Sequence, residues 1–390
     1  MNASKIKEWL PLAGLTCAAF VFNTSEFIPI GLLTDIAGDF EISESKAGLL
    51  ITIYAWVVAL TSLPLMLLAS KVEFRKLLLS IVGVFIVSHF FSAAASSYAM
   101  LMASRIGVAC AHAIFWSITP PLAVRIAPDG QKSAALSIIM AGTSVAMVIG
   151  LPLGRIIGLH TGWRTTFFCI AAVTFVIFLL LVFVFPKVPV RHTTSLKHIP
   201  SLLRQRNLMC VYITTVILVT GHYTGYSYIE PFLGQVARMN DGMVTLTLMI
   251  FGFVGMIGSF VFARYYAAHS LRLINLSIIA ITLMLLWMRF AAYNPYTAVL
   301  MCVFWGIAIV VYNLSFQAKI IEYAPQATAV AMSVYSGIFN LGIGTGALVG
   351  GIVCSSLSLH FIGYAGGLIA LSAAAYFMQE SGTAFKNTLK

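Results

Sequence analysis

Residues 9–33 read WLPLAGLTCAAFVFNTSEFIPIGLL, a run in which Glu26 is the sole charged side chain. A helix needs about 20 mostly apolar residues to cross the hydrocarbon core of a bilayer, so this run is long enough to span it. The run is longer than the apolar region of a signal peptide, it carries Asn23 and Glu26, and no small-residue cleavage site follows it. We therefore expect a retained membrane-spanning helix.

The rest of the chain has a similar composition. Of its 390 residues 60% are apolar and 9% are charged, whereas soluble proteins are about half apolar and about a quarter charged. A soluble core of this size cannot hide so much apolar surface, and disorder requires the opposite composition. The composition therefore predicts an all-α protein embedded in a membrane.

Further apolar runs of spanning length follow, joined by connections that are mostly shorter than the runs. Twelve runs begin near Trp9, Ala47, Leu77, Ala99, Ala134, Thr166, Leu208, Met243, Leu271, Tyr296, Ala327 and Phe361. The longest polar break separates six runs from six. We predict an N-terminal six-helix bundle over residues 1–186, a cytoplasmic linker over 187–207 and a C-terminal six-helix bundle over 208–390.

The net charge of +11 is explained by membrane topology. The basic residues lie in short breaks between apolar runs, and the sequence has no basic helix of the nucleic-acid-binding type, so we expect no nucleic-acid partner. With both termini in the cytoplasm, the inner segments hold 17 Lys and Arg residues and the outer segments five. This bias follows the positive-inside rule. The outer five are Lys46, Arg155, Arg164, Arg238 and Arg289, while Arg105 falls within a predicted helix.

The two halves of the chain repeat a pattern. Residues 125–128 read RIAP ahead of the fifth run, and residues 322–325 read EYAP ahead of the eleventh. Each leads into a glycine-rich helix, at Gly150–Gly154 and Gly344–Gly351. A duplicated chain of six plus six spans is typical of secondary transporters with a binding site near the bilayer midplane.

Six stretches of sequence carry a family resemblance: Phe22–Ala37, Ile51–Pro64, Ser104–Thr119, Gly150–Gly158, His222–Phe232 and Ser336–Gly350. In this order they resemble the drug:proton antiporter branch of the major facilitator superfamily. Within it they are similar to bacterial sugar efflux transporters of the arabinose- and IPTG-exporting type (SotB-like). The resemblance implies two pseudo-symmetric six-helix bundles, a monomer in the bacterial inner membrane, and a cavity lined by the first and fourth helices.

Two motifs of this superfamily are altered. The inner-loop signature Gly-x-x-x-Asp-Arg-x-Gly-Arg-Arg appears as MLLASKVEFRK at residues 66–76, where we expect Glu73 beside Arg75 to supply a substitute ion pair. In the fifth-helix antiporter motif, Pro152 follows a leucine and Gly154 is followed by an arginine. By resemblance, these four residues are assigned to gating.

Glu26 and Arg105 are ionisable residues inside predicted membrane helices, where a charge is expensive and marks a functional hypothesis. At about 1.5 Å per residue, both lie in the outer half of a core about 30 Å thick. By resemblance, the fourth-helix arginine belongs to a motif implicated in proton transfer. We hypothesise that Arg105 holds Glu26 or the substrate and that protonation of Glu26 weakens this grip. A static structural ion pair is the alternative.

Amide, hydroxyl and aromatic side chains at helical spacing predict a site for a neutral polar solute. The candidate residues are Asn23, Glu26, Arg105, His112, Trp116, His222, Tyr226, Trp305 and Asn340. Amides bind hydroxyl groups and aromatic faces cover C–H surfaces, whereas an anionic substrate would need clustered basic residues. For each candidate, core packing or a hydrogen bond between helices is the alternative role.

We therefore expect proton-coupled efflux of sugars or sugar-like small neutral molecules by alternating access, without a cofactor. A multidrug or nucleobase/nucleoside exporter of the same superfamily is the alternative within this class. An intramembrane enzyme would need paired acids or a metal-binding set, and a receptor would need an output domain; the sequence contains neither, nor a P-loop for ATP. The expected partners are the solute, protons and lipid.

Overall fold

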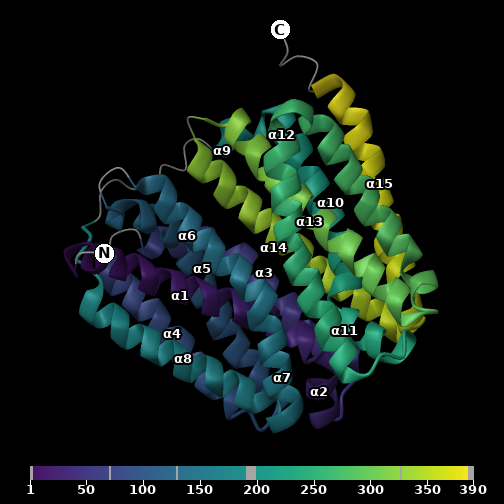
Figure 1. The fold of residues 1–390 in the computed structure, drawn as a ribbon, viewed down its shortest axis with the longest axis horizontal. Helices are drawn as coiled ribbons and strands as arrows, with labels where there is room; N and C mark the ends of the chain where they lie inside the picture. The colour runs from purple at the N-terminus through teal and green to yellow at the C-terminus, as the bar shows by residue number, and fades with distance from the viewer. Residues whose placement is uncertain (1–2, 70–71, 129–130, 190–198, 326, 385–390) are drawn as a thin grey trace. The chain divides into compact units, whose positions relative to one another are not determined.

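The computed structural model describes residues 3–69, 72–128, 131–189, 199–325 and 327–384, and over these ranges it contains helices and no strand (Figure 1). The helices are α1 (Ala3–Gly31), α2 (Leu33–Asp39), α3 (Glu44–Ala69), α4 (Phe74–Ala93), α5 (Tyr98–Ile126), α6 (Lys132–Val145), η1 (Ala146–Gly150), α7 (Leu151–Thr161), α8 (Trp163–Val184), α9 (Ile199–Leu203), α10 (Arg206–Tyr226), α11 (Ile229–Pro231), η3 (Phe232–Val236), α12 (Asp241–Ala291), α13 (Pro295–Tyr323), α14 (Thr328–Ser356), η4 (Leu359–Phe361) and α15 (Ile362–Ala384). The predicted all-α fold is confirmed.

Eleven helices of the described ranges are long and apolar enough to cross a membrane. The helix α12 has 51 residues, which at 1.5 Å per residue is about 77 Å, more than twice the thickness of a hydrocarbon core. Its backbone leaves the helical region at His269, with φ −139° and ψ 41°. This kink divides α12 into two crossings, which correspond to the runs predicted from Met243 and Leu271. Twelve crossings result, as predicted.

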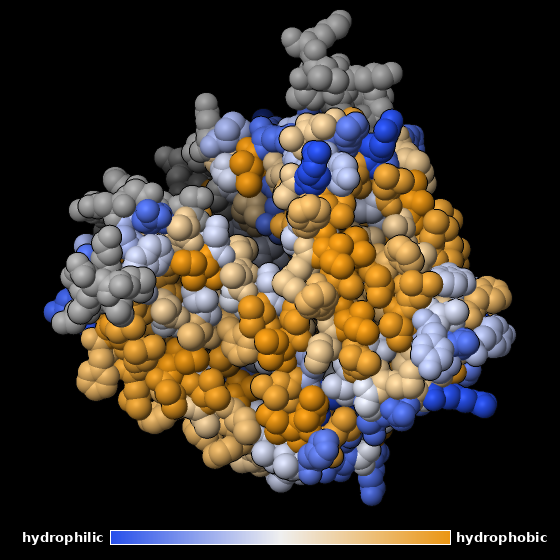
Figure 2. All heavy atoms as spheres, in the orientation of Figure 1, coloured by the Kyte–Doolittle hydropathy of each residue, from blue (hydrophilic) through white to orange (hydrophobic). Residues whose placement is uncertain are grey.

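Apolar side chains cover the outward faces of these helices. Phe183 is 86% exposed, Phe260 69% and Val176 66%, and Figure 2 shows apolar residues over the flanks of the helices on the face drawn. Large exposed apolar patches are unfavourable in water, but lipid solvates them. The chain is therefore a multi-pass membrane protein.

Contacts group the chain into two compact units, one of Met1–Phe40 and Leu60–Thr193 and the other of Glu41–Ala59 and Thr194–Lys390. The first part of α3 thus groups with the second unit, although the predicted N-terminal bundle covered all of residues 1–186. The reason is local packing on α14. Ser45 Oγ donates to the carbonyl of Gly351 (2.7 Å), and Trp56 Nε1 donates to Thr345 Oγ1 (3.4 Å).

The predicted division into two six-helix bundles and a linker stays a prediction. Residues 190–198 of the predicted linker lie outside the described residues, and α9 occupies Ile199–Leu203 within the same segment.

In the first unit, α1 packs closely along α6, η1 and α7. Glycines spaced four or eight residues apart face α1 at this contact, namely Gly142, Gly150, Gly154 and Gly158. A Cβ added to Gly154 would lie 2.0 Å from Cδ1 of Ile28, and Thr166 Oγ1 donates to the Gly154 carbonyl (2.9 Å). Small residues let helix backbones approach in a membrane, where the hydrophobic effect does not drive helices together. Close packing is thus the role that the structure shows for Gly154.

In the second unit, α10 lies against α14 and α15 in the same way. A Cβ added to Gly346 would lie 2.5 Å from the carbonyl oxygen of Thr220, and one added to Gly366 would lie 2.5 Å from that of Gly221. Because these neighbours are backbone atoms, they cannot rotate away. The helices touch at their main chains.

We expect Gly346→Ala to lower the thermal unfolding midpoint of the detergent-solubilised protein, because overpacking at a tight contact costs about 1–3 kcal/mol. Gly83→Ala is the control, since a Cβ at Gly83 would meet nothing within 4 Å. Equal midpoints for the two variants would contradict this account of the α10–α14 contact.

Candidate functional site

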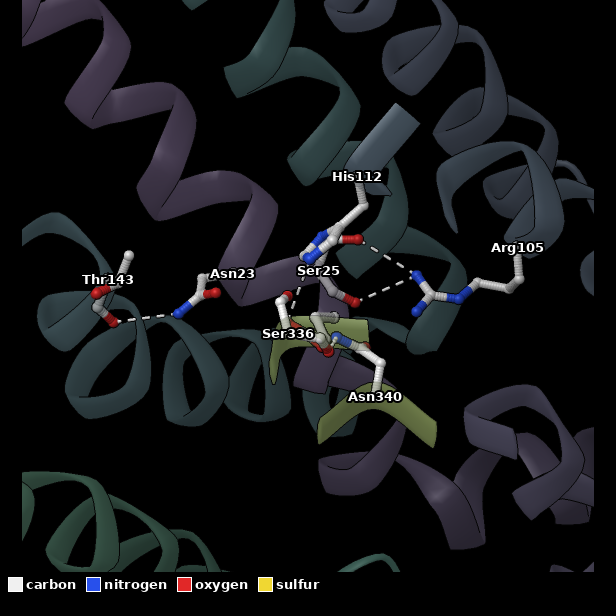
Figure 3. Close-up of polar contacts among 8 residues, drawn as sticks. Asn23, Ser25, Arg105, His112, Thr143, Ser336 and Asn340 are labelled. Carbon is white, nitrogen blue, oxygen red and sulfur yellow. Dashed lines mark hydrogen bonds and ion pairs between the residues drawn. The ribbon is translucent and has the colours of Figure 1, made fainter. Parts of the chain in front are cut away.

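The first unit contains a buried polar group that we call the Arg105 cluster: Ser25 and Glu26 from α1, His89 from α4, and Arg105 and His112 from α5. Arg105 is 1% exposed. Its Nη1 donates to both the carbonyl and the Oγ of Ser25, each at 3.2 Å (Figure 3). A guanidinium at membrane depth must be met by acceptors, and α1 supplies them.

The hydrogen bonds around His89 have a defined direction. Nδ1 of His89 lies 2.9 Å from the carbonyl oxygen of Phe85, and a carbonyl can only accept, so Nδ1 carries the hydrogen. In the neutral ring Nε2 is then an acceptor, and Ser25 Oγ donates to it across 2.7 Å. Ser25 therefore accepts from Arg105 and donates to His89. One hydroxyl joins three helices.

Aromatic packing holds these helices in register. The ring of Phe22 on α1 stacks on Phe85 of α4 (3.9 Å between centroids) and on Phe115 of α5 (4.0 Å). The Phe85 ring also lies 4.2 Å from the His89 ring. The polar contacts are thus enclosed by apolar surface.

Glu26 is the carboxylate of the cluster. Its Oε2 lies 3.6 Å from Nε2 of His112, with the two side chains 11% and 4% exposed. Arg105 binds Ser25, the residue directly before Glu26. The structure therefore brings the predicted residues Glu26, Arg105 and His112 together, and the His112 contact of Glu26 is an ion pair only when His112 is protonated.

Two further candidates lie in the same unit. Trp116 is half-buried and its ring packs against those of His112 (6.2 Å) and Phe115 (5.6 Å). Asn23 Nδ2 donates to the carbonyl of Thr143 on α6 at 3.5 Å (Figure 3). Their roles in substrate binding stay predictions.

In the second unit, His222, Tyr226 and Trp305 come together in a buried aromatic cluster with Phe251 of α12. Trp305 Nε1 donates to His222 Nδ1 (3.0 Å), and the rings of His222 and Tyr226 stack at 5.3 Å. This arrangement joins α10, α12 and α13, which is the packing role named as the alternative. Asn340 of α14 is 8% exposed and donates to the Ser336 carbonyl within its own helix (3.0 Å).

The two gating residues of the inner loop do not form the ion pair that we predicted. The Glu73 carboxylate accepts from the backbone N–H groups of Arg75 (3.1 Å), Lys76 (3.3 Å) and Val188 (2.8 Å), while the Arg75 guanidinium donates to the carbonyl of Val182 (2.5 Å). The prediction was wrong because Glu73 is the N-cap of α4, where free backbone donors compete for it. Ser70 and Lys71 of the same motif lie outside the described residues.

The other two gating candidates lie on the fifth span. Pro152 stands in the first turn of α7, directly after the π-helical segment η1. A π-helical turn is rare and is frequently found at functional sites. The gating role of Pro152 and Gly154 stays a prediction.

Sequence reasoning missed three residues. Ser25 carries no signal, because hydroxyls are common in membrane helices, but His89 was visible as an ionisable residue inside the third apolar run. Arg155 was placed in an outer segment; the structure buries it in α7, 1% exposed, with Nη1 donating to the carbonyl of Gly31 at the end of α1. The negative end of a helix dipole favours a cation there. The unbroken apolar run around Arg155 could have revealed this.

Metal-binding groups and cavities are the other features that bear on the site. Among the described residues no group of three or more His, Cys, Asp or Glu is placed to hold a metal ion. A cavity of about 300 Å³ lies between α4 and α5, lined by Val87, Ser88, Phe91, Met100, Ala103 and Ser104. Ser104 bonds Ser92 (2.8 Å), and apart from Ser88 and Ser104 the lining is apolar, so the residues that line this cavity include none of the charged groups of the Arg105 cluster.

We expect Ser25→Ala to destabilise the protein by about 1–3 kcal/mol, because a buried guanidinium loses an acceptor and His89 loses its donor. Thermal unfolding in detergent measures the effect. Ser117→Ala is the matched control, since among the described residues the Ser117 hydroxyl bonds only the carbonyl of Ala113 in its own helix. A Ser25 variant as stable as the control would show that the hydroxyl is not structurally important.

The Glu73 cap makes stability depend on pH. Burial alone would raise the pKa of Glu73, but the three backbone N–H bonds and the charge of Lys76 outweigh it and hold the pKa below its ordinary value of 4.5. The stabilisation is therefore present above pH 4.5 and is lost as the pH falls through the lower pKa of the folded state. We expect Glu73→Ala to lower the free energy of unfolding by about 0.5–2 kcal/mol at neutral pH. The variant should also lose less stability than the wild type as the pH falls. Unfolding midpoints measured from pH 3 to pH 7 check it, with Glu8→Ala at an exposed position as control.

Comparisons with known proteins address the fold. Residues 15–336 match the family model described as Major Facilitator Superfamily. The structure is similar to that of a bacterial homologue of the human lysosomal transporter Spinster in its inward-facing, unoccupied conformation, with a TM-score of 0.77, 16% identity, and coverage of 97% of this chain and 98% of that chain. The inward-facing, occupied conformation of such a homologue gives a TM-score of 0.71 at 16% identity, covering 96% and 97%. At this identity the likeness shows the fold alone.

Proposed function

Because the chain belongs to the major facilitator superfamily and is thus a transporter, not an enzyme, we propose that it exports a sugar or sugar-like neutral solute in exchange for protons. It acts as a monomer in the bacterial inner membrane, with both termini in the cytoplasm. The observation that supports this most is the Arg105 cluster, in which a membrane-embedded carboxylate lies 3.6 Å from an imidazole.

The cluster contains what proton coupling requires. Glu26 and His112 are both groups that gain and lose protons, and a charge among buried groups is sensitive to its neighbours. The Arg105 guanidinium carries a permanent positive charge and binds Ser25, the residue directly before Glu26. Protonation of Glu26 removes the attraction of its carboxylate for the Arg105 guanidinium. If this attraction differs between the inward-open and outward-open states, the proton shifts their equilibrium by that difference.

The chemistry of the candidate residues supports a neutral solute. The two buried arginines in the membrane spans, Arg105 and Arg155, already donate to the carbonyls of Ser25 and Gly31. An anionic substrate would need cations that are not used in this way. The amides of Asn23 and Asn340 are suited to hydroxyl groups instead.

We expect Glu26→Gln to abolish uphill export of labelled L-arabinose from proteoliposomes driven by an imposed pH gradient, while exchange of the sugar down its own gradient persists. The amide keeps the size of the side chain but carries no titratable proton. Glu8→Gln, the same change at an exposed position of α1, should transport like the wild type.

Export driven by the pH gradient in Glu26→Gln would remove Glu26 from the coupling mechanism. A panel that includes nucleobases, nucleosides and lipophilic drugs distinguishes the related exporter classes. Transport of these compounds without sugar transport would replace the proposed substrate.

A further inference from the structure

A second polar cluster lies wholly within the second unit, and neither the Arg105 cluster nor the aromatic cluster includes it. Tyr335 of α14 donates from its hydroxyl to Oδ1 of Asn313 on α13 (2.8 Å). Gln317, one turn further along α13, donates from Nε2 to the same oxygen (3.1 Å). The Tyr312 hydroxyl next to Asn313 donates to Thr215 Oγ1 of α10 (3.1 Å). Three helices therefore contribute polar groups here.

The cluster lies at membrane depth. Asn313 and Gln317 precede Tyr323, the last residue of α13, by ten and six positions. At 1.5 Å per residue this places them about 15 Å and about 9 Å from the end of the helix. Because α13 has 29 residues and is about 43 Å long, it extends about 7 Å beyond each side of a core about 30 Å thick, so Asn313 lies within the core and Gln317 near its edge. At the depth of Asn313 an amide without hydrogen bonds is costly.

Counting donors and acceptors shows what the two amides still offer. An amide oxygen has two lone pairs, and both of those on Asn313 are used, by Tyr335 and Gln317. The unused groups are the Asn313 Nδ2 donor and the Gln317 Oε1 acceptor, to which no described residue hydrogen-bonds. Both side chains are partly exposed, unlike Tyr335, which is 4% exposed. A donor and an acceptor, one helical turn apart, thus have no hydrogen-bond partner among the described residues and are accessible to a solute.

We propose that Asn313 and Gln317 form a hydroxyl-recognising subsite that determines which solute is exported. Asn313 Nδ2 donates to one hydroxyl of a vicinal diol, and Gln317 Oε1 accepts from the adjacent hydroxyl. Tyr335 is a positioning residue, because its hydroxyl orients the Asn313 amide. This inference rests on the proposed sugar export and names the residues that bind the hydroxyl groups of the sugar.

The surroundings favour a neutral diol over an anion. Lys319, the nearest cation along α13, is bound to Glu322 (2.7 Å), and Glu322 also accepts from the Tyr266 hydroxyl (3.0 Å). A vicinal diol presents donors and acceptors in pairs, as the two amides do. A lipophilic drug has no such groups and would leave the amides unpaired, which a polar site penalises strongly.

The test uses Gln317→Met, which removes the acceptor together with the Nε2 donor to Asn313 Oδ1, while leaving the Tyr335–Asn313 hydrogen bond in place. Transport of L-arabinose and of its monodeoxy analogues is measured with the full-length protein in proteoliposomes under a pH gradient. We expect KM for L-arabinose to rise about 5- to 10-fold, the effect of one lost hydrogen bond, with the maximal rate unchanged. Gln205→Met, the same change at an exposed position before α10, should leave KM unaltered.

The deoxy analogues separate recognition from a general structural effect. The wild type should discriminate against one analogue, lacking the hydroxyl that Gln317 binds, by about fivefold, and Gln317→Met should lose this discrimination. A variant that discriminates among the analogues as the wild type does overturns the subsite but leaves sugar export standing. A wild-type protein that moves none of these sugars overturns both proposals.

Discussion

The burial of the Arg105 guanidinium is the constraint on which the first unit depends. A permanent charge at membrane depth is tolerated only with acceptors around it, and the main chain and hydroxyl of Ser25 provide two. The same hydroxyl must then donate to His89, whose other nitrogen is held by Phe85. This chain of bonds sets the positions of α1, α4 and α5 relative to one another. The carboxylate of the cluster, Glu26, occupies its position because it follows the residue that Arg105 binds.

Such contacts need helix backbones that lie close together, and the glycine contacts make this possible. Lipid is as apolar as leucine, so burying apolar surface between helices gains little, and packing at small residues becomes the main source of association. Along α6, η1 and α7 the glycines admit Thr16, Thr24 and Ile28 of α1 and Leu32 directly after it. Arg155 on the same segment then reaches the carbonyl at the end of α1. Steric fit and charge placement are thus achieved by one contact.

The sequence predicted the number of spans and the ionisable residues inside them, because both follow from bilayer thickness and the cost of a charge. It separated the two crossings that α12 merges at His269. It did not predict the partners: Glu26 pairs with His112, Glu73 caps α4, and the start of α3 groups with α14. Each of these contacts depends on which donor or acceptor lies within about 3–4 Å in the folded chain. Composition and residue spacing do not predict that distance.

The two units treat polar groups differently, and this difference bears on mechanism. The first pairs its deep charges internally and retains one carboxylate beside an imidazole, which suits a proton. The second holds neutral amides with an unused donor and acceptor, which suit a hydroxyl group and would be poor ligands for a proton at physiological pH. The proposed proton carrier, Glu26, and the proposed hydroxyl subsite, Asn313 and Gln317, are different residues. In the proposed antiport, coupling between proton and solute therefore requires an equilibrium between conformations that each ligand biases, and its strength is bounded by the smaller of the two differences in affinity.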